Sequence, residues 1–309
     1  MTCAYAVRGA LKKNPGVDSV DVSLNKGLAT VKLKPGNNVQ PQQFWETVRR
    51  NGFTPKETRV VVRGQITGEK LNVTGSGQIF DLQADPKLLE DIKKLAGSLH
   101  LKMDTILAQS DWKRRPVTMV KPEDREGFLA DVRQAIVFAQ KLDIPQIILM
   151  SGDDVPGRTH EEQYASMLES VKRAGDLAAK ANLTLIIEPL NNKVDHKGVF
   201  LSTCGEGLKL VKESQNPHVK LLFDIYHEQV QVGNVIRTMR EAAPNVAVFH
   251  IADNPGRNDP GTGEMNYENI YKAIASFGYK GYVTMEYLPI GDQTASLTRA
   301  TRTMRSTLV

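Results

Sequence analysis

The sequence predicts an α/β protein, a (β/α)₈-type barrel that lacks its first βα unit, preceded by a small α+β module. Helical segments alternate with continuous apolar strands after about residue 85, which is typical of a parallel sheet covered by helices. Six strong strands follow residue 98 at intervals of about 25–40 residues, and this regular spacing favours a barrel over an open sheet. The first 65 residues follow a different order, α-β-β-α-β.

Composition narrows the class of protein. The chain has 309 residues, of which 40% are hydrophobic and 24% charged, so it is neither disordered nor collagen-like. No run of 18 apolar residues occurs, so no membrane-spanning helix is predicted. Two cysteines cannot form a disulfide framework, and Lys12 and Lys13 follow the first apolar residues rather than precede them, unlike a secretory signal. We therefore expect a cytoplasmic protein.

Charge is distributed unevenly along the chain. Residues 1–65 contain 11 Lys and Arg against 4 Asp and Glu, whereas residues 66–309 contain 29 against 31. This asymmetry indicates two modules. A basic module can meet nucleic acid, but here the basic residues are scattered and aromatic residues for base stacking are scarce. We therefore expect a solvated basic face, with neither nucleic acid nor membrane as a partner.

The N-terminal module, residues 1–65, shows clear helix and hairpin signals, and a strand-rich connector over residues 66–85 follows it. Pro15-Gly16 ends the first helix, Asn25-Lys26-Gly27 turns the hairpin, and Asn51-Gly52 ends the second helix. The expected elements are a helix over 4–13, strands over 19–24 and 28–33, a helix over 40–50 and a strand over 58–66.

The stretch MTCAYAVRGALKKNPGVDSVDVSLNKGLATVKL resembles the heavy-metal-associated domain, a ferredoxin-like carrier of copper or similar ions. The family's loop is Met-x-Cys-x-x-Cys, and its two thiolates suit a soft ion such as Cu(I). Here Cys3 is present, but Ala6 occupies the second cysteine position. We therefore expect a packing or partner module without tight metal binding. The family's first strand would precede Met1, so we also expect that Met1 is not the native start or that the module has been cut.

The second module, residues 86–309, alternates helices with strands. The expected helices cover 88–98, 123–142, 160–181, 205–214, 232–243, 267–278 and 296–308. The expected strands cover 99–109, 145–152, 183–190, 219–227, 246–253 and 281–288. Residues 78–83 are a candidate seventh strand of the barrel.

Ionisable residues interrupt four apolar strands near their carboxyl ends, the face where barrels of this class have their active sites. They are Glu188, Asp224, His250 and Glu286, with His227 and Asp253 close behind two of them. A lone buried carboxylate is costly unless it is paired or metal-bound, and four on successive strands reinforce one another. Three carboxylates and one imidazole suit Mn²⁺ or Mg²⁺ better than Zn²⁺.

Four segments resemble the hydroxypyruvate isomerase branch of the xylose-isomerase-like sugar isomerases and epimerases: IIEPLNNKVDHKG, LLFDIYH, FHIADNPGRNDPGTGEMNY and GYVTMEYLP. The resemblance spans about residues 86–309. It implies that Glu188 and Glu286 are both metal ligands and the acid/base pair. It further implies that Asp224 and His250 are ligands, although many relatives have Gln at the His250 position.

The same resemblance implies substrate contacts. His227 would contact a substrate oxygen or the outer shell of the metal, and Arg257 and Glu264 would shape the substrate loop. His196 is a further candidate, with a satisfied surface histidine as the alternative. For Arg257 the alternative is an internal ion pair with Glu264 or Asp253.

These observations favour a divalent-metal-dependent isomerase or epimerase of a small sugar or hydroxyacid, which moves a proton between adjacent carbons. An exposed barrel edge makes a homo-oligomer possible. One alternative is a zinc-dependent phosphodiester nuclease, but only His196, His227 and His250 lie near the expected mouth. The other is a non-catalytic sugar- or metal-binding protein with a damaged barrel.

Overall fold

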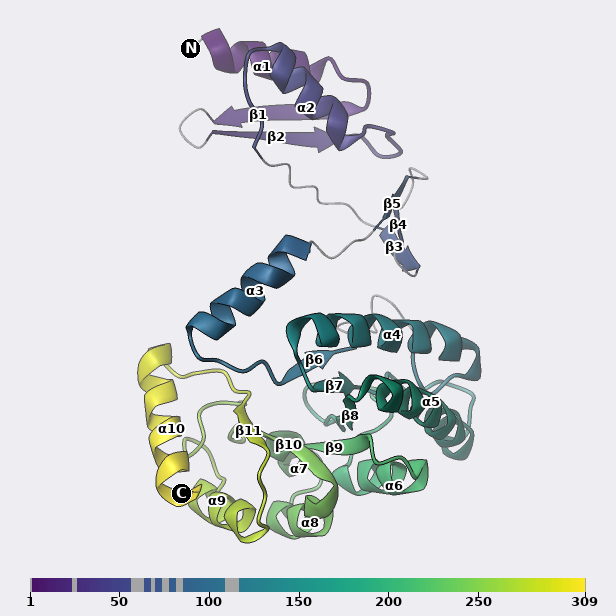
Figure 1. Ribbon diagram of the computed structural model, residues 1–309, viewed down its shortest axis with the longest axis vertical. Coiled ribbons are helices and arrows are strands. Elements are labelled where there is room, and N and C mark those ends of the chain that lie inside the picture. The colour runs from purple at the N-terminus through teal and green to yellow at the C-terminus, as the bar shows by residue number, and fades with distance from the viewer. Residues whose placement is uncertain are drawn as a thin grey trace. The chain divides into compact units, whose positions relative to one another are not determined.

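The computed structural model describes residues 2–23, 27–56, 64–67, 70–73, 78–81, 86–108 and 117–308. The chain divides into two compact units, residues 1–84 and residues 85–309. Figure 1 labels the elements of both units.

The first unit contains a two-stranded antiparallel hairpin of β1 (Val17–Ser23) and β2 (Leu28–Leu33). Helices α1 (Thr2–Lys12) and α2 (Pro41–Arg50) lie on one face of this hairpin (Figure 1). A small apolar cluster joins the helices to the strands, and its buried members are Val7, Leu11, Val17 and Val20. The predicted helices and hairpin are confirmed here. The Cys3 side chain lies outside the described atoms.

A three-stranded antiparallel sheet follows, made of β3 (Gly64–Thr67), β4 (Lys70–Val73) and β5 (Ile79–Asp81). Most of the strand expected over 58–66 falls outside the described residues. The prediction of a seventh barrel strand over 78–83 is wrong, because Ile79 and Phe80 pair with Asn72 and Leu71 of β4. A short apolar run identifies a strand but not its partner, and here the neighbouring hairpin provides the partner.

The second unit is built around a six-stranded sheet in the order β11-β10-β9-β8-β7-β6, in which every neighbouring pair is parallel. Its strands are β6 (Thr105–Leu107), β7 (Gln146–Leu149), β8 (Thr184–Ile187), β9 (Val219–Asp224), β10 (Val246–Ile251) and β11 (Tyr282–Met285). The predicted set of six strands is confirmed. The first is shorter than expected, since residues 101–104 are irregular.

Helices alternate with these strands. They are α3 (Pro86–Ser98), α4 (Arg125–Leu142), α5 (His160–Ala181), α6 (Cys204–Ser214), α7 (Ile225–Gln231), α8 (Val235–Ala242), α9 (Tyr267–Ser276) and α10 (Gln293–Leu308), with short 3₁₀ turns over Pro122–Asp124 and Ala243–Asn245. Within the described residues β6 and β11 do not pair, so the curved sheet is an incomplete barrel with two open edges. Leu107 and Tyr282 on these edges are 43% and 46% exposed.

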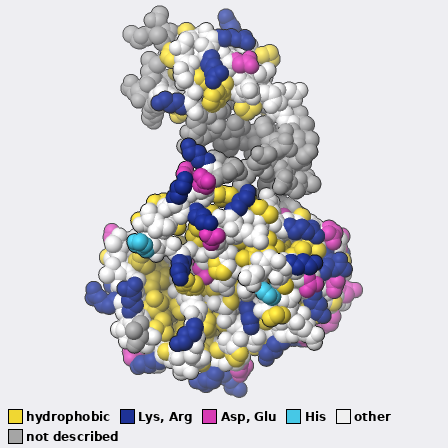
Figure 2. Space-filling model, in the orientation of Figure 1, with side chains coloured by type: hydrophobic (Ala, Val, Ile, Leu, Met, Phe, Trp, Pro, Cys, Tyr) yellow, Lys and Arg dark blue, Asp and Glu magenta, His cyan; other side chains and the backbone are white. Residues whose placement is uncertain are grey.

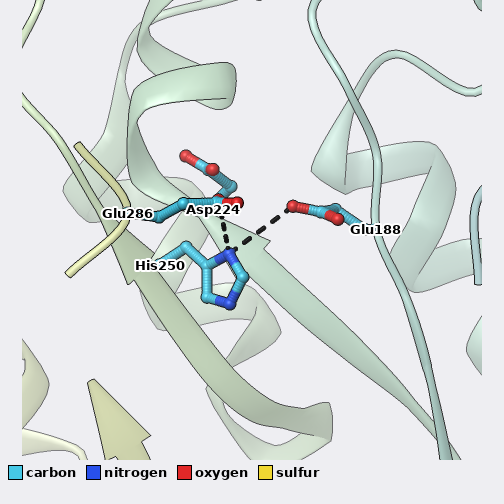
Figure 3. A group of neighbouring side chains, drawn as sticks. All are labelled: Glu188, Asp224, His250 and Glu286. Carbon is cyan, nitrogen blue, oxygen red and sulfur yellow. Dashed lines mark hydrogen bonds and ion pairs between the residues drawn. The ribbon is translucent and has the colours of Figure 1, made fainter. Parts of the chain in front are cut away.

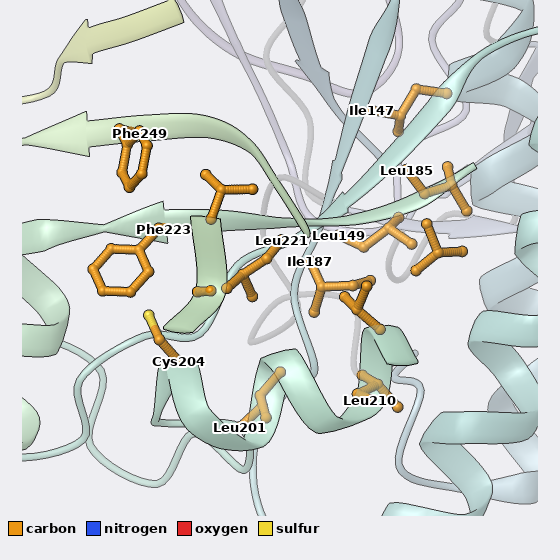
Figure 4. Close-up of a cluster of buried hydrophobic side chains, with 14 of the residues drawn as sticks. Ile147, Leu149, Leu185, Ile187, Leu201, Cys204, Leu210, Leu221, Phe223 and Phe249 are labelled. Carbon is orange, nitrogen blue, oxygen red and sulfur yellow. The ribbon is translucent and has the colours of Figure 1, made fainter. Parts of the chain in front are cut away.

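Alternate residues of the central strands pack on opposite faces of the sheet. The helix-facing set joins the main core, which Figure 4 shows between the strands and α6. The intervening residues of β7, β8, β9 and β10 form a second buried cluster on the other face: Ile148, Ile186, Leu222 and Val248. Burial on both faces explains why these strands read as continuous apolar runs.

Lysine and arginine side chains are spread over the visible face of the second unit, with acidic side chains among them (Figure 2). No helix in the described part of the chain is long and apolar enough to cross a membrane.

Candidate active site

The period-two alternation of the strands brings four ionisable side chains to one face of the sheet. Glu188 stands two residues after Ile186, Asp224 two after Leu222 and His250 two after Val248, and the three apolar residues form the cluster on the face away from the helices. The sheet register aligns His250 with Asp224 on one side and with Thr284 on the other, two residues before Glu286. The four side chains therefore meet at the carboxyl end of the sheet.

The distances are short. One donor atom of each side chain can be chosen so that all four atoms lie within 4.8 Å of one another. Nδ1 of His250 lies 2.8 Å from Oε2 of Glu286 and 3.6 Å from Oε1 of Glu188 (Figure 3). Glu188, Asp224 and His250 are buried, whereas the Glu286 side chain is 45% exposed. The cluster thus has one side open to a small ligand.

Burial, charges and hydrogen bonds shift the pKa values of three of the four side chains. Burial would lower the pKa of His250, but the hydrogen bond to Glu286 and the negative charges of Glu188 and Glu286 raise it to about 10. Burial would raise the pKa of Glu286, but the hydrogen bond and charge of His250, with the charge of Arg257, lower it to about 2. Burial and the charge of Glu286 raise the pKa of Asp224 to about 6.

The continuous apolar run predicted that His227 stands at the end of a strand, and this prediction is wrong. Strand β9 ends at Asp224, whose side chain accepts the backbone N–H of His227 at 3.0 Å and so caps α7. The His227 side chain is 1% exposed, and its Nε2 lies 3.7 Å from Oδ2 of Asp224. Burial and the charge of Arg257 lower the pKa of His227 to about 4.

Arg257 reaches the cluster rather than its own loop. Its Nη2 lies 3.0 Å from Oε2 of Glu286 and 3.7 Å from Oδ2 of Asp224, and its guanidinium lies 5.4 Å from the centre of the Tyr226 ring. These contacts differ from the alternative of a pair with Glu264 or Asp253. The residue adopts a left-handed φ of 54°, a strained conformation of the kind found at functional sites.

The loop that carries Arg257 is organised by Asp253, which is fully buried. Its carboxylate accepts backbone N–H groups of Asn254, Gly261 and Met265 at 2.9, 2.7 and 3.2 Å. Glu264 lies on the same loop and accepts from the side chains of Asn254 and Gln229. Glu264 thus contacts Asn254 and Gln229 rather than the four converging side chains.

His196 lies beside His227, with its ring centre 5.3 Å from that of His227. Its side chain is half-buried, and burial together with the charges of His227 and Arg257 lowers its pKa.

Sequence reasoning missed three further polar residues that contact this region. Asn191 donates to Asp195 at 2.6 Å and lies 2.6 Å from Nδ1 of His227, and the Tyr226 hydroxyl donates to Asp195 at 2.9 Å.

The donor set fits a divalent cation. Three carboxylates and an imidazole supply oxygen-rich coordination. The three converging carboxylates also carry more negative charge than the neighbouring cationic side chains, such as Arg257, can balance. The candidate metal site consists of Glu188, Asp224, His250 and Glu286. Among the described residues, this is the group of His, Cys, Asp and Glu side chains close enough together to hold an ion.

Comparison with known proteins shows which families the two parts of the chain resemble. The heavy-metal-associated domain model matches residues 1–54, and the model for the xylose isomerase-like TIM barrel matches residues 66–306. The hydroxypyruvate isomerase of Escherichia coli (strain K12) is 34% identical over 168 residues, which are 54% of this chain and 65% of that protein. The putative hydroxypyruvate isomerase of Homo sapiens is 31% identical over 181 residues, 57% of this chain and again 65% of the relative.

Solved structures show the same fold. An AP endonuclease, family 2, from Brucella melitensis superposes with a TM-score of 0.64 at 26% identity, covering 69% of this chain and 83% of that one. A 3-keto-D-glucoside 4-epimerase from E. coli gives 0.61 at 20% identity, covering 73% and 88%. The chain spans just under two thirds of the length of these curated relatives. Because the family model covers most of the sequence, the chain belongs to the xylose isomerase-like TIM barrel family.

Proposed function

We propose that the second unit is a divalent-metal-dependent isomerase or epimerase of a small sugar or hydroxyacid, with Mn²⁺ or Mg²⁺ as the cation. The convergence of Glu188, Asp224, His250 and Glu286 within 4.8 Å carries the proposal. The relatives named as hydroxypyruvate isomerases and 2-oxo-tetronate isomerase support the reaction class.

The four side chains hold the cation in this proposal. When bound, the cation supplies Lewis-acid stabilisation of the negative oxygen that develops when an α-hydroxycarbonyl loses a carbon-bound proton. Glu188 and Glu286 come from strands at different positions of the sheet, β8 and β11, with Asp224 and His250 between them. One carboxylate removes the carbon-bound proton. In epimerisation the other carboxylate, in its protonated form, returns a proton to the opposite face of the same carbon; in isomerisation a proton returns to the adjacent carbon while the hydroxyl proton passes to the former carbonyl oxygen.

The surrounding residues orient the substrate. Arg257 presents a guanidinium beside the open side of the cluster, where it can hold a carboxylate or hydroxyl oxygen of the substrate. His227 offers a buried ring nitrogen to a second oxygen, and the His196 ring contacts the His227 ring edge-on. Glu264 acts indirectly, since it fixes the Asn254 end of the loop that carries Arg257.

The test is an isomerisation assay on a panel of small substrates with Mn²⁺, Mg²⁺ or Zn²⁺. The panel contains hydroxypyruvate and a 2-oxo-tetronate, as the names of the relatives indicate, and adds short ketoses. We expect turnover with Mn²⁺ or Mg²⁺ and its loss in Asp224→Asn. The matched control is Glu241→Gln, which removes an exposed carboxylate on α8 whose partner is Arg237.

Two other outcomes would contradict the proposal. Metal-dependent binding of panel members without turnover in the wild-type chain would indicate a binding protein with an incomplete barrel. Zinc-dependent cleavage of a phosphodiester, without isomerisation, would indicate a nuclease.

A further inference from the structure

His227 has a hydrogen-bond arrangement that fixes which ring nitrogen carries the proton. Its Nδ1 lies 3.3 Å from the backbone nitrogen of Asn191, and the same atom lies 2.6 Å from Nδ2 of the Asn191 side chain. A backbone N–H can only donate, so this longer contact favours Nδ1 as the acceptor. Asn191 and His227 are 0% and 1% exposed, so water does not compete for these contacts.

The orientation of the Asn191 amide leads to the same conclusion independently. Its Oδ1 accepts the backbone N–H groups of Val194 and Asp195 at 3.0 and 3.1 Å. Its Nδ2 faces Oδ2 of Asp195 at 2.6 Å on one side and the His227 ring on the other. The reverse orientation would set an NH₂ against two N–H donors and an oxygen against a carboxylate. The amide therefore presents a donor to Nδ1 of His227.

The proton of the neutral ring consequently resides on Nε2. This atom is buried and has no hydrogen-bond partner among the described residues. Its nearest ionic neighbour is Oδ2 of Asp224 at 3.7 Å, beyond hydrogen-bond length. A buried donor without a partner is rare in folded proteins, and this one lies beside a candidate metal ligand at the carboxyl end of the sheet.

We propose that Asn191 is a positioning residue that holds His227 in the Nε2–H form, aimed at an oxygen of the bound substrate. In this form Nε2 can donate to a carbonyl or developing oxyanion, but it can neither accept a proton nor bind the cation. That a substrate oxygen accepts the hydrogen bond from Nε2 rests on the proposed function. The position of the proton on Nε2 follows from the hydrogen bonds of His227 alone.

The first experiment measures the tautomer directly. Full-length protein labelled with ¹⁵N-histidine is examined by long-range ¹H–¹⁵N correlation at pH 7.5 with Mg²⁺, and His227→Gln identifies the His227 signals by their loss. We expect an unprotonated Nδ1 and a protonated Nε2. A protonated Nδ1 would overturn the proposal. The spectrum is decisive whether or not a substrate is found, so failure of the proposed function would be recognised separately.

The second experiment changes the donor. Asn191→Asp places an acceptor against Nδ1, and Asn191→Leu removes the side-chain donor at similar volume. We expect kcat to fall about 10–100-fold, as for other residues that orient a site histidine, while the Kd for Mn²⁺ changes far less. In Asn191→Asp the proton should appear on Nδ1. Unchanged tautomer and kcat in this variant, or equal losses of kcat and metal affinity, would overturn the positioning role.

The control is Asn192→Asp, which adds the same charge one position along the chain. The Asn192 side chain is exposed, and its backbone N–H donates to Gln231. This variant should keep the His227 tautomer and kcat of the wild type. If it matched Asn191→Asp in both, added charge rather than the Asn191 hydrogen bond would explain the effect, and the proposal would be wrong.

Discussion

Glu188 and Glu286 both approach Nδ1 of His250, at 3.6 Å and 2.8 Å. Because they share this neighbour and are proposed to share one cation and one substrate, we expect them to act as a unit. Glu188→Gln and Glu286→Gln keep the side-chain volume but remove a base and weaken a ligand. Each should lower kcat by at least about 10²-fold, within the usual range for general acid–base catalysis.

The double variant should be little worse than the poorer single variant, since residues that act together lose activity non-additively. Turnover is measured at saturating Mn²⁺, so that weaker metal binding is not mistaken for slower chemistry, with Glu241→Gln as the control. Near-wild-type kcat in either single variant would remove that residue from the mechanism.

His227 is proposed to contact substrate rather than the cation. His227→Ala should therefore lose turnover, about 10-fold or more by analogy with other hydrogen-bonding groups of active sites, and keep its affinity for Mn²⁺. Equilibrium dialysis gives the affinity and the panel assay gives the turnover. Loss of metal in proportion to lost activity would instead make His227 a ligand.

The meeting of the four side chains could be predicted because it depends only on strand alternation and on the shared edge of parallel strands. The environment of His227 could not be. Its pocket depends on Asn191 and Asp195, whose loop conformation leaves no periodic signal in the sequence. The helix start at Asp224 did leave a signal, an N-cap aspartate, but the apolar residues Ile225 and Tyr226 after it continued the strand pattern.

At the scale of elements, α6 approaches the sheet closely at a glycine. A Cβ on Gly207 would come within 2.8 Å of both Leu221 Cδ1 and Pro189 Cγ, whereas a Cβ on Gly205 of the same helix would meet nothing within 4 Å. Leu221 can adjust its rotamer, but the Pro189 ring is held by the chain that leads from β8. Gly207→Ala should therefore lower the free energy of unfolding by about 1–3 kcal/mol, as overpacking does.

Gly205→Ala is the matched control and should be neutral or stabilising by up to about 1 kcal/mol. Urea denaturation of the two variants beside the wild type measures the difference. Equal stabilities of the two variants would show that α6 does not pack against the sheet at this distance.

Strand identity was predicted better than strand pairing. The apolar runs of β7 to β10 are buried on both faces, so their composition alone indicates a parallel sheet. Residues 79–81 are too short a run to reveal their partner, and they pair with β4. The first strand of the parallel sheet was predicted too long because the leucines at 99 and 101 resemble core residues, although they are 57% and 62% exposed.

At the scale of the whole molecule, the two units differ in the ligands that they can supply to a metal ion. The chain has two cysteines, Cys3 in α1 and Cys204, which is buried in the second unit. One thiolate is a poor site for Cu(I), which favours several soft ligands. We expect no equimolar Cu(I) complex that survives competition with a chelator.

Competition titration of the wild type, Cys3→Ser and Cys204→Ser checks this. A competition-resistant complex that disappears only in Cys3→Ser would show that the N-terminal unit binds copper despite Ala6.

The central claim is that one divalent cation binds at the carboxyl end of the sheet. Crystals of the full chain grown with Mn²⁺, with anomalous differences measured near the manganese edge, locate the ion directly. The account predicts one strong peak within bonding distance of Glu188, Asp224, His250 and Glu286, with none bonded to His196 or His227. Absence of that peak at saturating Mn²⁺, or a second ion bound by His196 and His227 as in a multi-metal hydrolase, would contradict it.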